Sequence, residues 1–397
     1  MILSADWLDA APIKAVVAAL QAAKPNSVRF VGGCVRNTIM GRPIDDIDMA
    51  TQLTPEACQS ALEAAGIRVL PTGIAHGTLT ALIEGQTLEI TSLRRDVETD
   101  GRRAVVAFTE DWHEDAQRRD FRLNALYAAP DGELFDPTGA GLEDALAARI
   151  VFIGDPDQRL KEDYLRILRF FRFNAWYGGE MDAAGLAACV RQMPGLQKVA
   201  RERIWKEVHK LLSAPNPFDT LYAMHMHGLL TEILPHTVSL DCAEDLRVTE
   251  HFLHASPDAL LRLMALIPRT AEAVYATAEA LRLSKLETSR LVMWAADNLP
   301  TLNGVTGPQL RALLYWHGKQ AVADRAMLSG QNVRDLMAAI GSWRRPELPV
   351  TGKDALAAGF KGAEIGQALS QLAQAWVASD FSLSREALLD LWVQQPN

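Results

Sequence analysis

The chain has 397 residues, of which 49% are apolar and 22% are charged, as expected for a soluble protein with two or three packed domains. Its 40 Lys and Arg against 49 Asp and Glu leave a formal net charge of −9, which excludes a histone-like polybasic binder but not a locally basic groove. No apolar stretch approaches the roughly 20 residues of a membrane-spanning helix, and the first residues lack a secretory pattern, so we expect no membrane partner.

The cysteine pattern bears on metal binding and on the compartment. Cys34, Cys58, Cys189 and Cys242 lie far apart and form no CxxC spacing. Such spacing predicts neither a zinc site nor a disulfide framework, and it is typical of a reducing environment. We therefore expect a cytoplasmic protein without zinc.

Short strand-like and helical runs alternate over the first 150 residues. The patterns predict strands within residues 27–33, 47–51, 77–85 and 87–93, and helices within residues 34–41 and 54–66. The polar stretch 94–103 contains almost nothing that could be buried and predicts a mobile loop. Residues 122–137 predict a hairpin with a Pro-Asp-Gly turn.

The character of the sequence changes near residue 150. From about Asp155 onward strand signals vanish, and Leu, Ala and Arg recur in helical periods. The predicted fold class is therefore α+β, with a mixed head followed by an all-helical remainder.

Residues 29–51 contain the first candidate site. Gly32 and Gly33 follow a predicted strand and open a predicted helix, so their backbone N–H groups could approach an anion. Arg36 lies three residues beyond Gly33 and could reach the same anion. A tight turn in which the glycine pair only packs is the alternative interpretation.

The same segment carries a pair of carboxylates. Asp46 and Asp48 are two residues apart on a strand-like segment, which places both side chains on one face. Adjacent carboxylates repel unless a cation lies between them, and hard oxygen ligands suit Mg²⁺, which also binds substrate phosphates. Asp45 points to the other face and receives no metal role. A solvated acidic turn is the alternative, but the phosphate cradle upstream favours a metal site.

A second segment, residues 117–126, places Arg119 and Asp120 beside an apolar run, with Asn124 as a two-sided hydrogen-bonding group. An exposed Arg–Asp pair, which contributes little stability, is the alternative interpretation here.

A charged stripe is predicted on a helix over residues 161–173. Four side chains recur there at every third position: Asp163, Arg166, Arg169 and Arg172. Residues 159–210 carry eleven Lys or Arg and six Asp or Glu, so this region is locally basic in an acidic chain. Three arginines on one helix repel each other, so the stripe predicts an anion or an acidic partner nearby; a solvated stripe with pairs such as Glu162–Arg166 is the alternative.

Five segments together resemble the class II nucleotidyltransferase superfamily: GGCVRN, DDIDMAT, RRDFRLNAL, EDYLRILRFFRF and RERIWKE. More narrowly, they are similar to the bacterial tRNA nucleotidyltransferases that build the 3′-terminal CCA, which are close kin of bacterial poly(A) polymerases. The resemblance covers about residues 28–210. It implies a catalytic head with a small mixed sheet (1–150), a helical neck that reads the nucleotide base (151–235), and a helical body and tail that bind tRNA (236–397).

The resemblance also implies roles for individual residues. Asp46 and Asp48 match metal-binding catalytic carboxylates. The matching nucleotide-binding residues are Gly32, Gly33, Arg36, Arg119, Asp163, Arg166, Arg169 and Arg172. One departure from the family is visible at Asn37, where the family usually has Asp. The amide keeps the size and hydrogen bonding of the carboxylate but removes its charge, so we expect a site with altered properties rather than an inactive one.

The implied reaction is template-free addition from CTP and ATP to the tRNA 3′ end and acceptor stem, by attack of the RNA 3′-hydroxyl on the α-phosphate with two Mg²⁺ ions. CTP and ATP share an amino donor beside a ring-nitrogen acceptor, whereas UTP and GTP present a carbonyl beside an N–H. Asp163 and Arg166, one helical turn apart, would pair with C and A. U or G would leave them unpaired, at about 1–3 kcal/mol for each lost hydrogen bond.

Several alternatives stay open. Glu89 is either a third catalytic carboxylate or a structural residue, and residues 94–103, with a pivot at Gly101, resemble the family's flexible loop. A poly(A) polymerase is the nearest rival, but residues 70–85 lack its basic signature. A CC-only or A-only enzyme, or more remotely a catalytically silent RNA-binding protein, are further alternatives.

Overall fold

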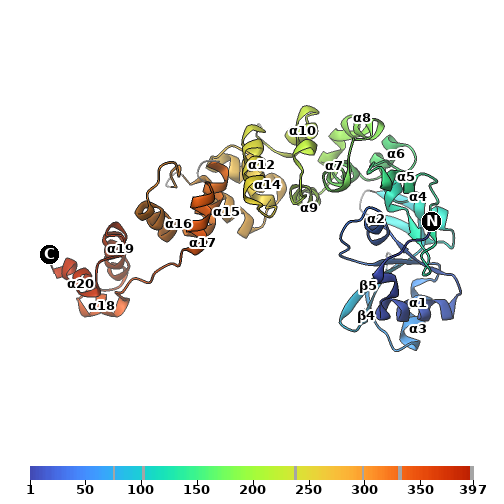
Figure 1. Ribbon diagram of the computed structural model, residues 1–397, viewed down its shortest axis with the longest axis horizontal. Helices are drawn as coiled ribbons and strands as arrows, with labels where there is room; N and C mark the ends of the chain where they lie inside the picture. Colours follow the sequence, from blue (N-terminus) through green and yellow to red (C-terminus); the bar gives the residue numbers. More distant parts are fainter. Residues whose placement is uncertain (75–76, 101–102, 237–238, 297–298, 330–332, 394–397) are drawn as a thin grey trace. The chain divides into compact units, whose positions relative to one another are not determined.

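The computed structural model describes the whole chain except residues 75–76, 101–102, 237–238, 297–298, 330–332 and 394–397. The chain divides into two compact units, Met1–Ile233 and Leu234–Asn397 (Figure 1). None of the described helices combines the length and apolar character that crossing a bilayer requires. The expected division near residue 150 falls inside the first unit and stays a prediction.

In the described part of the first unit, seven strands form one mixed sheet in the order β3-β4-β5-β2-β1-β8-β9. The strands are β1 (Val28–Val31), β2 (Asp48–Thr51), β3 (Arg68–Gly73), β4 (Thr78–Ile83), β5 (Gln86–Ser92), β8 (Tyr127–Ala128) and β9 (Leu134–Phe135). β2 and β5 run parallel, and the other neighbours are antiparallel. The predicted strands and the predicted hairpin after residue 122 are thus confirmed.

The stretch predicted as a mobile loop is instead a two-stranded hairpin. β6 (Arg94–Asp100) pairs antiparallel with β7 (Arg103–Phe108), from Arg94 opposite Phe108 to Asp100 opposite Arg103. The prediction was wrong because ladder hydrogen bonds use backbone groups, which a polar sequence supplies as well as an apolar one. The expected pivot, Gly101, lies outside the described residues.

The described helices of the first unit are α1 (Ala11–Ala23), α2 (Gly33–Ile39), α3 (Pro55–Ala64), α4 (Trp112–Gln117), α5 (Gly141–Leu146), α6 (Pro156–Glu162), α7 (Leu165–Tyr177), α8 (Ala183–Gln192), α9 (Arg201–Leu212), α10 (Phe218–Met226) and α11 (Leu229–Ile233), with 3₁₀ turns at Asp6–Asp9, Arg122–Asn124 and Met193–Lys198. Of these helices, α1, α2 and α3 pack against the sheet, whereas α6 to α11 pack mainly against one another. α2 and α3 confirm the two predicted head helices. Thr54 caps α3 by accepting a hydrogen bond from the Ala57 N–H at 3.3 Å.

The single helix predicted over residues 161–173 is wrong in one respect. α6 ends at Glu162, Asp163 has extended dihedrals (φ −152°, ψ 105°), and α7 begins at Leu165. Asp163 Oδ1 accepts a hydrogen bond from the Leu165 N–H at 3.1 Å, so this side chain satisfies a donor at the start of α7. Asp163 and Arg166 therefore do not share one continuous helix.

Aromatic packing fixes α7 against the sheet-bearing part of the unit. Phe121 and Phe152 have ring centroids 4.9 Å apart, and Phe170 of α7 stacks on Phe152 at 5.5 Å. Phe173, one turn further along α7, lies 5.1 Å from Phe121. Phe121, Phe152 and Phe170 are fully buried, so truncating one of them would cost about 3–5 kcal/mol. This packing sets the position of the charged side chains on the same helix.

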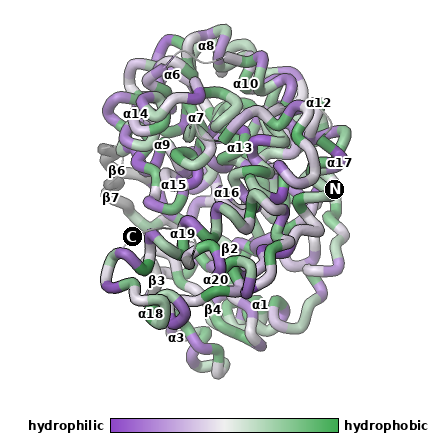
Figure 2. Tube along the Cα trace, turned by 90° about the vertical axis from the view of Figure 1, so that its left-hand side faces the viewer, coloured by the Kyte–Doolittle hydropathy of each residue, from purple (hydrophilic) through white to green (hydrophobic). Residues whose placement is uncertain are grey.

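The described part of the second unit is helical. Its helices are α12 (Asp241–Leu253), α13 (Ala259–Leu266), α14 (Ala271–Leu281), α15 (Lys285–Ala295), α16 (Gly307–Ser329), α17 (Val333–Ser342), α18 (Gly352–Ala357), α19 (Ala363–Ala378) and α20 (Arg385–Val393). Hydrophobic and hydrophilic residues alternate along these helices (Figure 2), as expected where each helix buries one face. The α+β class with a helical remainder is confirmed.

Candidate active site

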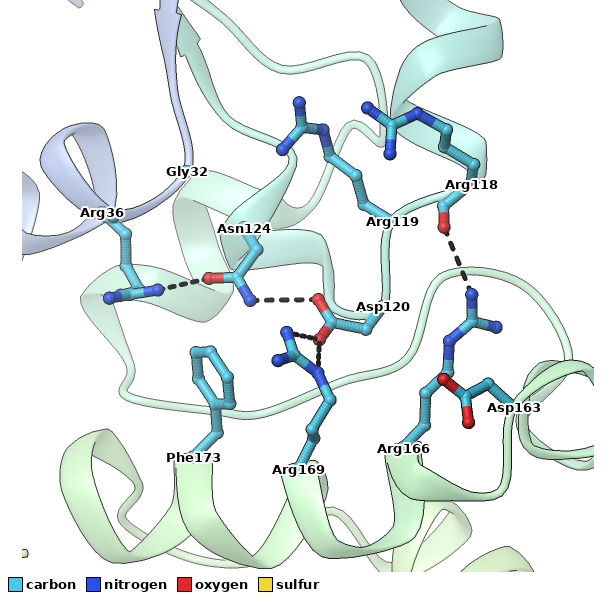
Figure 3. A pocket seen from close by; sticks show the side chains of 11 residues that line it. Gly32, Arg36, Arg118, Arg119, Asp120, Asn124, Asp163, Arg166, Arg169 and Phe173 are labelled. Atoms are coloured by element: carbon cyan, nitrogen blue, oxygen red, sulfur yellow. Dashed lines mark hydrogen bonds and ion pairs between the residues drawn. The ribbon is translucent and has the colours of Figure 1, made fainter. Parts of the chain in front are cut away.

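A cavity of about 390 Å³ lies between the turn before α2, the segment after α4, and α7 (Figure 3). It is lined by Gly32, Gly33, Arg36, Arg118, Arg119, Asp120, Asn124, Asp163, Arg166, Arg169 and Phe173. Five arginines against two aspartates make the lining strongly basic in an acidic chain. Such a concentration of guanidinium groups attracts a polyanion such as a triphosphate.

Because Gly32 and Gly33 have no side chains, their backbone is left uncovered at one wall of the cavity. Gly32 has φ 73° and ψ −123°, a left-handed conformation that favours glycine. A Cβ built on Gly32 would lie 3.9 Å from Arg119 Nη1 and 4.0 Å from Asp48 Oδ2, so a guanidinium and a carboxylate border this space. Because α2 has only seven residues, we assign most of the attraction for an anion to the arginines rather than to the helix dipole.

Arg36 is buried, and its described hydrogen-bond partners are neutral. Its Nε and Nη2 donate to Asn37 Oδ1 at 3.0 and 2.8 Å, its Nη1 donates to Asn124 Oδ1 at 2.5 Å, and its Nη2 donates to the Tyr177 hydroxyl at 2.9 Å. Burial lowers the pKa of Arg36 from its ordinary value. Asn37 in turn donates to the Pro43 carbonyl at 2.6 Å. The guanidinium is thus held in place without direct pairing to a carboxylate.

The candidate metal carboxylates, Asp46 and Asp48, are not among the residues that line this cavity, but Asp48 Oδ2 lies 4.0 Å from a Cβ built on Gly32, which does line it. Asp48 is the first residue of β2 and pairs in register with Glu89 of β5, whereas Asp46 is exposed and precedes the strand. The premise that both aspartates lie on one strand is therefore wrong. Burial raises the pKa of Asp48 to about 6, and the neighbouring Glu89 and Asp46 add to this rise.

This electrostatic environment suits a cation. Two carboxylates that repel each other in a partly buried place are stabilised when a divalent ion lies between them. Among the described residues, no three His, Cys, Asp or Glu side chains form a ready metal cluster. Asp46 and Asp48 alone would supply only two oxygen donors, so an ion held by them would keep waters and bind substrate phosphates.

The pair Arg119–Asp120, considered from the sequence as a possible ion pair, is separated in the structure. Arg119 Nη2 donates to Asp115 Oδ2 at 3.0 Å, and Arg169 Nε donates to Asp120 Oδ2 at 2.7 Å. Although burial lowers the pKa of Arg119, its neighbours Tyr127 and Asp115 raise it above the ordinary value. Arg119 is thus a permanently charged, anchored group beside Gly32.

A chain of hydrogen bonds crosses the cavity from α7 to α2 (Figure 3). Asp120 accepts from Arg169 on one oxygen and from Asn124 Nδ2 on the other, at 3.0 Å, and Asn124 Oδ1 accepts from Arg36. Figure 3 shows Arg169 and Phe173 projecting from the same helix toward this chain. The groups that meet a ligand are therefore held before it arrives, which lowers the cost of binding.

Asp163 and Arg166 lie at the far wall of the cavity and are each held by other side chains. Asp163 Oδ2 accepts a hydrogen bond from Arg203 Nη2 at 2.7 Å. Arg166 Nη1 donates to Glu162 Oε2 at 2.6 Å and its Nη2 to the Arg118 carbonyl at 3.3 Å. One carboxylate and one guanidinium on a shared wall are the pair that a base with an amino donor and a ring-nitrogen acceptor requires.

The structure brings seven of the sequence-derived nucleotide-binding residues to this cavity: Gly32, Gly33, Arg36, Arg119, Asp163, Arg166 and Arg169. Arg172 is not among its lining residues; its Nε donates to Glu207 Oε2 at 2.6 Å. Four lining residues were left unassigned: Arg118, Asp120, Asn124 and Phe173. Two of these residues could have been identified from the sequence, because Asn124 lies four residues after Asp120 and Phe173 lies four residues after Arg169.

Comparison with known proteins identifies the family of the chain. The family model of the poly A polymerase head domain matches residues 28–151, and that of the probable RNA and SrmB-binding site of polymerase A matches residues 180–240. The chain is 33% identical to the mitochondrial CCA tRNA nucleotidyltransferase 1 of Mus musculus over 386 residues, which is 93% of this chain and 87% of the relative.

Two bacterial proteins extend the comparison. The chain is 40% identical to the CCA-adding enzyme of Streptococcus pyogenes serotype M2 over 189 residues, 47% of this chain and 46% of that enzyme. Its fold is similar to that of the Bacillus stearothermophilus CCA-adding enzyme in complex with CTP, with a TM-score of 0.76, 24% identity, and coverage of 97% and 98% of the two chains. Since a relative at 33% identity spans nearly the full sequence, this chain belongs to the CCA tRNA nucleotidyltransferase family, within the group that also contains the poly(A) polymerases.

Proposed function

We propose that the cavity between α2 and α7 is the nucleotide site at which this tRNA nucleotidyltransferase adds the 3′-terminal CCA from CTP and ATP. The observation that carries the proposal is that Gly32, Arg36 and Arg119 on one side and Asp163 and Arg166 on the other line one cavity of about 390 Å³. That volume falls within the usual range of small-molecule sites. A single bound nucleotide can therefore meet both sets of side chains.

The triphosphate end of the nucleotide would lie at the glycine turn. The backbone of Gly32 and Gly33 leaves space there, while Arg36 and Arg119 supply two positive charges whose positions are fixed by other side chains. Preorganised charges bind a transferring phosphate without having to reorganise during the reaction. This arrangement favours departure of pyrophosphate at this wall.

Asp163 and Arg166 would read the base. Asp163 can accept a hydrogen bond from the exocyclic amino group of C or A, and Arg166 can donate to the neighbouring ring nitrogen. Arg203 and Glu162 hold these two side chains, so neither can turn freely to suit U or G. Selection of the nucleotide thus needs no nucleic-acid template.

Nucleotidyltransferases of this class use divalent metal ions, and we assign Mg²⁺ to Asp46 and Asp48. The raised pKa of Asp48, caused by burial and then by Glu89, fits a site that is completed by a cation. When bound there, the metal lowers the pKa of the RNA 3′-hydroxyl and neutralises charge on the triphosphate. Asp46 is exposed and Asp48 partly buried, so the site opens toward incoming RNA.

The RNA partner is tRNA, contacted at its 3′ end and acceptor stem. We assign residues 1–150 to the catalytic head, 151–235 to the neck, and 236–397 to a body and tail that bind tRNA. The match of residues 180–240 to an RNA-binding family lies almost wholly within the assigned neck, so it supports RNA contact there. We place the protein in the cytoplasm, in keeping with the free, buried thiols of Cys34, Cys58 and Cys189.

The test is to incubate the full chain and Mg²⁺ with tRNA that lacks its 3′ end, supply CTP, ATP or both, and sequence the products. Addition of C, C and A in order is the expected result. A long A tail would identify a poly(A) polymerase. Products that stop after CC, or that gain only A, would identify a CC-only or an A-only enzyme. Retention of the RNA with no addition by a folded protein would identify a silent RNA binder and overturn the proposal.

A further inference from the structure

A buried carboxylate beneath the cavity has no role in the mechanism above. Asp115 belongs to α4 and is 1% exposed, and it does not line the cavity itself. Burying an ionised carboxylate is costly unless charge-assisted hydrogen bonds compensate for the lost water. The contacts of Asp115 therefore show which interactions compensate for burying its charge.

Both oxygens of Asp115 are taken by neighbouring arginines of the cavity wall. Arg118 donates to Oδ1 from Nε at 2.9 Å and from Nη2 at 2.8 Å. Arg119 donates to Oδ2 from Nε at 3.2 Å and from Nη2 at 3.0 Å. Each guanidinium thus meets one oxygen through two nitrogens, which restricts both its direction and its rotation.

Tyr127 of β8 fixes the carboxylate from the other side. Its hydroxyl donates to Asp115 Oδ2 at 2.6 Å and accepts from Arg119 Nε at 3.2 Å. The Tyr127 ring is fully buried and packs edge-on against Trp112, with centroids 5.3 Å apart. A sheet residue in the core therefore determines where Asp115, and through it Arg119, can lie.

The same carboxylate also contacts the hairpin that follows β5. The Arg94 N–H at the start of β6 donates to Asp115 Oδ1 at 3.4 Å, and Arg95 Nη1 lies 3.8 Å from Oε1 of Glu114. One short helix thus connects the base of the β6–β7 hairpin with two arginines of the cavity wall.

We propose that Asp115, fixed by Tyr127, is a positioning residue that holds the Arg119 and Arg118 guanidinium groups in the orientation that receives the nucleotide. The inference rests on the proposed function of the cavity and adds to it the element that sets its geometry. Without the carboxylate, two adjacent guanidinium groups repel each other and turn apart. A bound nucleotide would then have to order them again, which weakens binding.

The experiment uses the full chain with two variants, Tyr127→Phe and Asp115→Asn. Tyr127→Phe keeps the buried ring and removes one hydroxyl. We expect the Kd for CTP without tRNA, and the KM for CTP in addition to tRNA, to rise about fivefold to tenfold, as for loss of one charge-assisted hydrogen bond. We expect kcat to change less than about twofold, because the bonds broken and formed are not touched.

Asp115→Asn should raise the Kd and the KM for CTP further, since it affects both Arg118 and Arg119. The Asp115 pKa lies well below its ordinary value, because Arg119 and Arg118 outweigh the effect of burial, so the rise should be equal from about pH 6 to about pH 9. The matched control is Asp144→Asn. Asp144 is fully buried, lies 3.1 Å from Arg149 and 3.7 Å from Arg122, and does not line the cavity. The Asp144→Asn variant should leave the KM for CTP unchanged.

Two results would overturn the inference. One is an unchanged Kd and KM for CTP in Tyr127→Phe, which decides the matter even if Asp115→Asn fails to fold. The other is a lower KM in Asp115→Asn, which would mean that the carboxylate only reduces the positive charge of the cavity. If the wild-type chain binds CTP but adds nothing to tRNA, the proposed function fails, and the Kd for CTP still tests the positioning role.

Discussion

Arg169 of α7 and Asp120, which follows α4, form an ion pair between segments 49 residues apart in the sequence, with Arg169 Nε donating to Asp120 Oδ2 at 2.7 Å. The Asp120 carboxylate is 8% exposed. Burial alone would raise its pKa, but Arg169 and the amide of Asn124 lower it to about 2. The ionised carboxylate therefore stabilises the fold in which α7 forms one wall of the cavity.

The first prediction concerns this pair. Because the folded-state pKa of Asp120 is below its ordinary value near 4, the stabilisation is present above about pH 4 and is lost as the pH falls toward about 2. Asp120→Asn should lower the free energy of unfolding at pH 7 by about 2 kcal/mol. Urea unfolding of both proteins at several pH values measures this difference.

The pH dependence separates this effect from general damage. The difference between wild type and Asp120→Asn should shrink as the pH falls below about 4. Asp157→Asn, which removes a partly exposed partner of the exposed Arg191 side chain, is the control and should change stability much less. A difference that stays constant down to about pH 2 would show that the ion pair is not its source.

The second prediction concerns Asn37, whose Oδ1 accepts two hydrogen bonds from Arg36. Asn37→Asp would place a negative charge directly on this guanidinium and weaken its attraction for a triphosphate. We expect the KM for CTP to rise about threefold to tenfold with little change in kcat. Ser60→Asp adds the same charge on the exposed side of α3 and should have no effect. A lower KM in Asn37→Asp would contradict the assigned role of Arg36.

Much of the fold follows from local sequence pattern. The run VRFVGG gives a strand that ends in a glycine turn, and Thr54-Pro55 gives a capped helix, because these signals act within a few residues. Strand β6 could not be recognised, since its polar sequence lacks the alternation that marks a half-buried strand, whereas its partner β7 is largely apolar and carries a strand signal of its own. The break at Asp163 was also hidden, because a continuous helical period runs through it.

The sequence predicted which residues belong to the candidate site better than it predicted which residues they contact. Gly32, Arg36 and Arg166 were found from motifs and do line one cavity. The partners of Arg119 and Asp120 were not foreseen, because adjacent residues in the sequence point to different elements: Arg119 pairs with Asp115, and Asp120 pairs with Arg169. Such pairings depend on tertiary packing of the kind that Phe121 and Phe152 make with α7.

The third prediction concerns base selection. Asp163→Ala and Arg166→Ala should each admit UTP and GTP, because the groups that those bases leave unpaired are gone. The preference for CTP over UTP, measured as the ratio of kcat/KM on tRNA lacking its 3′ end, should fall about tenfold or more. Arg191→Ala removes an exposed arginine of the same unit that pairs with Asp157 and should keep the preference. If both cavity variants still reject UTP and GTP, base selection lies elsewhere.

The fourth prediction separates metal binding from catalysis. Asp48 is partly buried beside Glu89 of the neighbouring strand, and the two carboxylates repel each other in the absence of a cation. Asp48→Asn should therefore abolish nucleotide addition and yet raise the free energy of unfolding of the metal-free protein, by about 1–2 kcal/mol. Thermal unfolding in the presence of a chelator measures the second effect.

Added Mg²⁺ should raise the Tm of the wild-type chain, because a ligand that binds the folded state stabilises it. The rise should be lost in Asp48→Asn and reduced in Asp46→Asn, whereas Asp45→Asn, which changes an exposed neighbour without a metal role, should keep it. These unfolding curves do not depend on activity, so they test the site directly. An equal Mg²⁺-dependent rise in wild type and Asp48→Asn would mean that the ion binds elsewhere, and Asp48 would then act in catalysis without holding a metal.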